Sequence, residues 1–215
     1  MIFSSTFLLS LWLTLSTAQN NNYDFFLLVM QYAPALCSDG TFKKCPSNLI
    51  TNFTLHGLWP ERTDGSYPQH CTNDKFDPSQ IAPIETELDT YWLSLNGPNP
   101  SFWSHEYETH GTCAQDVLPT ELGFFNTTLS LRTTYDITPA LAVAGITPSS
   151  TKSFTRDEFD TAILNAFGYP ILLACDSSGY ITGATVCISK QFKIMSCGSV
   201  TYGKCNSNTL YLIDA

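Results

Sequence analysis

Positive charge is scarce in this sequence. Its 215 residues include 10 Lys and Arg against 19 Asp and Glu, which gives a formal net charge of −9 at pH 7. A protein that holds nucleic acid through the phosphate backbone is normally basic. The composition therefore argues against stable, non-specific binding to DNA or RNA. It leaves room for a transient encounter with RNA.

Long apolar runs are also missing. Phe7–Leu15 is shorter than the roughly 20 residues that span a membrane, and Phe25–Met30 has only the length of a strand. Phe7–Leu15 reads as the core of a secretory signal, and the small residues Ser16-Thr17-Ala18 precede a cleavage point at Gln19. No Lys or Arg precedes this core. We expect residues 1–18 to be a signal peptide and the mature chain to be exported, to the extracellular space or a vacuole, without membrane insertion.

Repeats, low-complexity tracts and linker-like composition are absent as well. With 43% hydrophobic and 13% charged residues, residues 19–215 are typical of one globular domain with a sizeable core. We expect this domain to be a monomer.

CxxC spacings of the kind found in zinc sites do not occur. The chain does contain eight cysteines, which in an exported protein indicate four disulfides. Sequence alone leaves more than a hundred pairings open. Proximity favours only the small loop Cys37–Cys45.

Hydrophobic patterning predicts strands near both ends of the chain and helices in the middle. Tyr23–Tyr32 is almost continuously apolar, as expected of a strand buried on both faces, and Asn52–Leu58 is expected to be a second central strand that carries His56 at its end. The other expected strands are Tyr169–Cys175, Tyr180–Ser189 and Gln191–Cys197, and the expected helices are Asp77–Leu95, a segment starting near Ser101, Leu122–Tyr135 and Thr155–Phe167. This order predicts an α+β fold with one central, mostly antiparallel sheet and several helices, stapled by disulfides.

Two of the four histidines lie in the segment Phe102–Cys113, FWSHEYETHGTC. In a helix His105 and His110 diverge by roughly 140°, which does not suit joint binding of one zinc ion. Glu106 and Thr109 fall within the same arc. Alone, this pattern is equally compatible with a solvated polar helix face.

A third histidine, His56, lies in Phe53–Pro60, FTLHGLWP. An isolated histidine in an apolar run is most often a satisfied core residue. Here, however, three of four histidines fall in two short aromatic motifs. Two histidines form an acid–base pair that needs no metal, because an imidazole titrates near pH 6.5.

The motifs HGLWP and FWSHEYETHGTC resemble the two active-site segments of the ribonuclease T2 family, which includes secreted plant S-like ribonucleases and self-incompatibility ribonucleases. Asp24–Cys37, DFFLLVMQYAPALC, and the cysteine layout extend the resemblance over essentially the whole mature chain. It implies an endoribonuclease that cleaves single-stranded RNA through a 2′,3′-cyclic phosphate, with little base specificity and no metal or cofactor. The acidic composition favours the S-like branch of the family.

The resemblance also implies residue roles. His110 is the expected base, His56 the expected acid, His105 a phosphate ligand, and Glu106 a partner of the phosphorane or of a histidine. Base-binding candidates are Gln31, Trp59 and Phe102. Core packing is an equally good interpretation for the two aromatics, and a backbone-bonded amide is a slightly better one for Gln31. The implied disulfides beyond Cys37–Cys45 are Cys71–Cys113, Cys175–Cys205 and Cys187–Cys197.

One position departs from the family pattern. The residue before the last histidine of the second motif is usually Lys, and here it is Thr109. No Lys or Arg at all lies between Lys75 and Arg132. The alternative function is therefore a weakly active or inactive relative that serves storage or defence. Asn52 and Asn126 begin sequons and are candidates for glycosylation.

Overall fold

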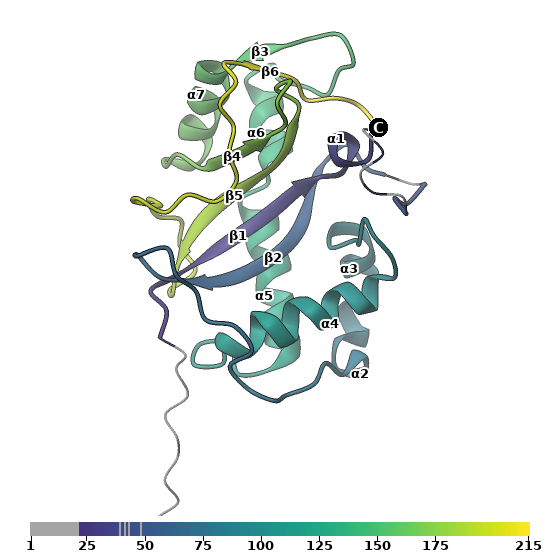
Figure 1. Ribbon diagram of the computed structural model, residues 1–215, viewed down its shortest axis with the longest axis vertical. Coiled ribbons are helices and arrows are strands. Elements are labelled where there is room, and N and C mark those ends of the chain that lie inside the picture. The colour runs from purple at the N-terminus through teal and green to yellow at the C-terminus, as the bar shows by residue number, and fades with distance from the viewer. Residues whose placement is uncertain (1–21, 39, 41, 43, 48) are drawn as a thin grey trace, which may run out of the picture.

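A computed structural model describes residues 22–38, 40, 42, 44–47 and 49–215 (Figure 1). The predicted signal peptide, residues 1–18, lies outside these described residues. Within them, no helix has the length and apolar character needed to cross a lipid bilayer.

The centre of the molecule is a four-stranded antiparallel sheet, as expected. Its strand order is β2 (Phe53–Glu61), β1 (Phe25–Tyr32), β5 (Ile181–Ser189) and β4 (Leu172–Cys175). A separate two-stranded ladder pairs β3 (Phe154–Thr155) with β6 (Thr209–Leu210), which the sequence did not indicate. The predicted strand Gln191–Cys197 is wrong. Only Ile194 forms an antiparallel bridge, to Ile188, and Phe192 near the start of this segment has a left-handed backbone (φ 59°) that does not fit a strand.

Helices cover the sheet and its ends. Helix α5 (Glu121–Thr134) runs behind the sheet, while α2 (Pro78–Ile81), α3 (Glu85–Tyr91) and α4 (Asn99–Thr109) gather beside β2 (Figure 1). The opposite end carries α6 (Ile137–Val143) and α7 (Arg156–Phe167), and α1 (Ala33–Ser38) follows β1 directly. The expected capping box is present on α7, where Thr155 and Glu158 bond each other's backbone, and Gly168 ends the helix at φ 76°.

The predicted helix Asp77–Leu95 is broken into shorter pieces. Asp77 caps α2, a 3₁₀ turn covers Ala82–Ile84, and α3 ends at Tyr91. Pro83 has no N–H to donate, so a continuous α-helix is not maintained through this point.

β1 explains why the sequence shows an unbroken apolar run. Phe26, Leu28 and Met30 contribute to the main core, whereas Phe25, Leu27 and Val29 belong to a second cluster with Val200 and the Cys187–Cys197 disulfide. Side chains alternate across a strand, so both sets are buried only if both faces of the sheet are covered.

A β-bulge at His56 changes which residues of β2 reach the main core. Leu55 pairs with Met30 and Gly57 with Val29, so His56 is an extra residue in the ladder. Before the bulge Leu55 faces the main core, and after it Leu58 does. The shift places Trp59 on the same side of the sheet as His56. The strand also continues to Glu61, so the expectation that His56 ends it is wrong.

Four disulfides join Cys37 to Cys45, Cys71 to Cys113, Cys175 to Cys205 and Cys187 to Cys197. Proximity in the sequence predicted the first pair and the family resemblance implied the other three, and all four predictions are confirmed. Cys71–Cys113 attaches the 3₁₀ turn after α4 to the loop after β2. The two histidine motifs are therefore covalently linked through their flanks.

Candidate active site

Helix α4 is fixed by its two buried aromatic residues. Trp103 and Tyr107 pack into the main core, and the Trp103 indole donates to the Trp92 carbonyl at 2.7 Å. The helix begins two residues before the predicted Ser101 and ends at Thr109. His110 is thus the first residue past the helix, and its N–H still bonds the Glu106 carbonyl.

Three of the four histidines meet at one cavity of about 260 Å³. Its walls come from β2, α4, the loop after β2 and the C-terminal loop: His56, Trp59, Glu61, Tyr67, Gln69, His105, Glu106, His110 and Tyr202. All four predicted catalytic residues line it. None of the lining residues is Lys or Arg.

Glu106 lies at the floor of the cavity and is fully buried. Its Oε2 accepts a hydrogen bond from the Trp59 indole at 2.8 Å, and its Oε1 lies 3.6 Å from His56 Nε2. The Trp59 ring stacks on His110 with centroids 4.8 Å apart and planes 18° from parallel. Trp59 therefore contacts both a carboxyl and an imidazole of the site.

Burial sets the charge states of the titratable groups in the cavity. It raises the pKa of Glu106 to about 8 against the opposing effect of the Trp59 hydrogen bond, so this carboxyl is protonated near neutral pH. Burial, reinforced by the His105 charge, lowers the pKa of His56 to about 4. Burial and the charges of the other three histidines lower the pKa of His110 to about 3.

Two buried polar atoms in this cavity find no hydrogen-bond partner among the residues that the structure describes. They are Oε1 of Glu106 and Nδ1 of His110. An unmade hydrogen bond at a buried atom is costly, so such atoms commonly mark a ligand position. A phosphate monoanion placed here would accept a hydrogen bond from protonated Glu106 and would favour the charged form of the histidines.

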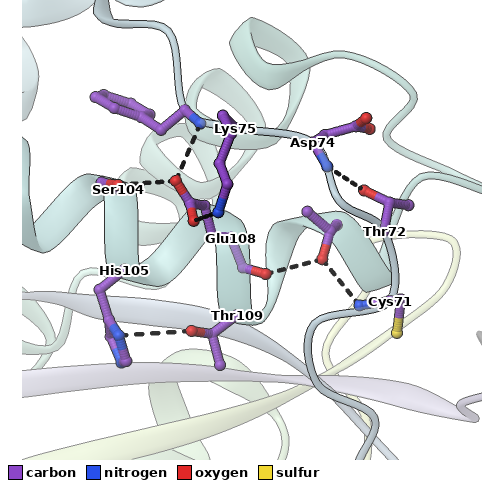
Figure 2. A network of polar contacts seen from close by, with 10 residues as sticks. Cys71, Thr72, Asp74, Lys75, Ser104, His105, Glu108 and Thr109 are labelled. Carbon is purple, nitrogen blue, oxygen red and sulfur yellow. Dashed lines mark hydrogen bonds and ion pairs between the residues drawn. The ribbon is translucent and has the colours of Figure 1, made fainter.

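His105 is exposed at the cavity rim. Its Nδ1 lies 3.5 Å from the hydroxyl of Thr109, which is itself 3% exposed (Figure 2). The neighbouring Glu108 takes no part in this contact. It accepts hydrogen bonds from Lys75 at 2.7 Å and Ser104 at 3.2 Å on another side of the helix (Figure 2).

The base-binding candidates occupy different environments. Phe102 stands edge-on to His56 with centroids 5.3 Å apart, and it also packs against the main core. Gln31 does not line the cavity, since its amide is buried and donates to the Leu93 carbonyl at 2.9 Å. This is the backbone-bonded arrangement that was the alternative interpretation.

Several residues that surround the cavity were not predicted from the sequence. Glu61 directly follows HGLWP, and burial raises the pKa of its carboxyl to about 7. Tyr67 and Gln69 belong to the turn-rich segment after β2, and the backbone N–H of His70 donates to the Thr109 carbonyl. Tyr202 had no local signal, because it reaches the site only through the fold.

The sequons differ in accessibility. Asn126 is exposed on α5, whereas Asn52 is half-buried and its Oδ1 accepts a hydrogen bond from Thr138 at 2.5 Å. No cluster of three or more His, Cys, Asp or Glu side chains with the geometry of a metal site occurs in the described part of the chain.

Comparison with known proteins agrees with this architecture. The model of the Ribonuclease T2 family matches residues 23–197. Ribonuclease DdI of Dictyostelium discoideum is 36% identical over 95% of this chain and 96% of its own length, and extracellular ribonuclease LE of Solanum lycopersicum is 32% identical over 87% and 86%. The structure of trichomaglin, described as a novel S-like ribonuclease, superimposes with a TM-score of 0.79 at 33% identity and covers 89% of this chain and 98% of its own. The chain belongs to the ribonuclease T2 family.

Proposed function

We propose that this protein is a secreted, acidic endoribonuclease that cleaves single-stranded RNA without a metal or cofactor. Membership of the ribonuclease T2 family supports endoribonuclease activity. The observation that carries the proposal is the cavity itself, which is lined by the half-buried imidazole of His56 and the buried imidazole of His110 together with the protonated carboxyl of Glu106. These are the groups that an intramolecular phosphoryl transfer requires.

The reaction would proceed by attack of the ribose 2′-oxygen on the adjacent phosphorus. His110 takes the 2′-hydroxyl proton as this bond forms, and protonated His56 gives a proton to O5′ as the P–O5′ bond breaks. The products are a 2′,3′-cyclic phosphate and a free 5′-hydroxyl. Exchange with solvent then returns the two histidines to their starting states. DNA lacks the nucleophile and is not cleaved.

Glu106 and His105 would stabilise the charge on the phosphorane. The proton of Glu106 suits a hydrogen bond from Oε1 to a phosphoryl oxygen, because Oε2 is already bonded to Trp59. His105 supplies positive charge at the rim when protonated, and Thr109 orients its ring. Trp59 and Phe102 are placed to wall the bases. We assign no substrate contact to Gln31, whose amide is already hydrogen-bonded.

Secretion and glycosylation are parts of the same proposal. Four disulfides are typical of proteins that mature in an oxidising compartment, and one relative is named an extracellular ribonuclease. We propose removal of residues 1–18, an extracellular or vacuolar location, a monomeric state and attachment of glycan at the exposed Asn126 in preference to Asn52.

The test is cleavage of a single-stranded RNA and of the matching DNA by the purified protein, with and without EDTA. We expect RNA cleavage that EDTA does not change, a 2′,3′-cyclic phosphate terminus by mass spectrometry, and intact DNA. His56→Phe and His110→Phe should each lower turnover by roughly 10²–10⁴-fold. Loss of activity in EDTA, cleavage of DNA, or wild-type rates in either variant would contradict the proposal.

A second candidate rests on the cavity's lack of Lys or Arg. With Thr109 at the position where relatives carry Lys, the protein would be a weakly active storage or defence protein. Accumulation of folded protein with no cleavage in the same assay would favour this function.

A further inference from the structure

Tyr202 reaches the active-site cavity from a loop that lies far from both histidine motifs in the sequence. This loop, residues 198–204, is attached to the sheet at both ends. Cys197 is bonded to Cys187 of β5, and Cys205 to Cys175 of β4. The loop is therefore a disulfide-bounded element that closes one side of the cavity.

The ring of Tyr202 stands nearly perpendicular to Trp59, at 88°, with centroids 5.0 Å apart. Perpendicular pairs of this kind are favourable beyond the apolar area they bury, because the edge of one ring meets the face of the other. Both rings also pack against the second hydrophobic cluster, which contains Val200 of the same loop. The position of Trp59 is thus determined partly by a residue outside HGLWP.

Trp59 is the side chain that connects Tyr202 to the proposed catalytic groups. It stacks on His110, stands edge-on to His56 at 5.2 Å and donates to Glu106. It is also half-exposed, so the strand alone does not enclose it. Removing one of its walls leaves room for the indole to tilt and for water to reach His110.

We propose that Tyr202 is a positioning residue, which holds Trp59 against His110 and keeps the Trp59–Glu106 hydrogen bond in place. The C-terminal loop is then a third element of the active site, beside the two motifs. The contact is between rings, so the aromatic ring of Tyr202 rather than its hydroxyl carries the effect. This inference rests on the proposed catalytic roles of His110 and Glu106, and its structural part is testable without them.

The structural part is tested by the chemical shifts of the His110 ring protons in NMR spectra of the purified protein with its disulfides intact. Stacking on an indole shifts these protons through the ring current. We expect Tyr202→Ala and Tyr202→Leu to lose this shift. We also expect them to raise the measured pKa of His110, because water can then reach its ring and screen it from the titratable groups that surround it, which are His56, His70, His105 and Glu106. Tyr202→Phe should resemble wild type. Unchanged His110 signals in Tyr202→Ala would overturn the proposal whether or not the protein cleaves RNA.

The catalytic part is tested with a dinucleoside phosphate. We expect Tyr202→Ala and Tyr202→Leu to lower kcat by about 10-fold or more with little change in KM, because small misplacements of catalytic groups are expensive. Tyr202→Phe should retain the rate, and Tyr169→Ala, at an exposed tyrosine before β4, is the matched control. A rise in KM alone, or equal losses in Tyr202→Phe and Tyr202→Ala, would mean that Tyr202 contacts substrate, and would overturn the positioning role. If Tyr202→Ala does not fold, Tyr202→Leu decides the question.

Discussion

Residue 109 shows how one side chain alters the electrostatics of the site. Thr109 is almost fully buried and its hydroxyl faces His105, so a histidine with a hydrogen-bonding partner stands where the family pattern described above usually has a lysine nearby. A lysine is charged throughout the physiological range, whereas a histidine gains its charge only on the acidic side. We therefore expect catalysis by this protein to depend more strongly on pH than catalysis by a variant with lysine at this position.

Thr109→Lys should restore a fixed cation at the phosphate. We expect kcat to rise by about 10-fold or more, since one oxyanion donor contributes roughly 10²–10³. We also expect activity to extend toward neutral pH. The measurement is the pH–rate profile on a dinucleoside phosphate, with Thr109→Met as a control of similar length without charge. An unchanged rate and profile would show that another basic residue already neutralises the phosphate.

The same profile reports on His56 and His110. Burial lowers their pKa values to about 4 and 3, and a bound phosphate anion would raise both. Because kcat/KM reflects the free enzyme and kcat the complex, the wild-type kcat optimum should lie at higher pH than the kcat/KM optimum, and both on the acidic side of neutrality.

At the scale of elements, β2 illustrates what the sequence predicted and what it did not. The strand, the capping box of α7 and the order of helices and strands followed from hydrophobic period and cap residues. The β-bulge at His56 did not, because nothing in the pattern FTLHGLWP fixes which partner residue is skipped. The same holds for Tyr202, since its contact with Trp59 joins segments far apart in the sequence and its loop is held by the Cys187–Cys197 and Cys175–Cys205 disulfides.

The three histidines of the cavity were recognisable as candidates because two motifs carry them. The cavity wall was not, because Tyr67, Gln69 and Tyr202 come from loops without periodicity. The short strands β3 and β6 were not predicted from the sequence for a related reason. Two residues give too little pattern, and their pairing depends on the C-terminal segment folding back onto α7.

Gly57 is the residue of β2 that permits the Trp59–Glu106 hydrogen bond. A Cβ at this position would overlap Oε2 of Glu106 and the indole nitrogen of Trp59. Gly57→Ala should therefore separate this pair and lower kcat by roughly 10²-fold, with a loss of about 1–3 kcal/mol in unfolding free energy from overpacking.

The control for Gly57→Ala is a double-mutant cycle with Trp59→Phe, measured by rate and by urea unfolding. Phenylalanine has no indole nitrogen, so Gly57→Ala should cost less in the Trp59→Phe background than in wild type. Additive losses would indicate that the glycine is needed for another reason.

For the whole molecule, buried titratable groups make stability depend on pH in two opposing ways. Burial raises the pKa values of Glu61 and Glu121 to about 7 and that of Glu106 to about 8, so the folded state retains protons that the unfolded chain releases. Their contribution is fully present below about pH 4.5 and is lost as pH rises toward 7–8. His56 and His110, with lowered pKa values, act in the opposite sense. They favour unfolding as pH falls from about 6.5 toward 3–4.

These two trends place maximum stability between about pH 4.5 and 6.5, below neutrality. Glu121 allows the effect of the buried carboxyls to be measured apart from that of the histidines. It does not line the active-site cavity, and both of its carboxyl oxygens accept the Asp77 N–H. Glu121→Gln should raise the melting temperature at pH 7.5 and leave it nearly unchanged at pH 4.5, whereas Glu85→Gln, at an exposed position of α3, should change neither. The measurement is thermal unfolding from pH 4 to 8. A wild-type melting temperature that rises steadily up to pH 8 would mean that these carboxyls ionise in the folded protein, and Glu106 would then enter catalysis as a carboxylate that orients His56 instead of donating a proton to the phosphorane.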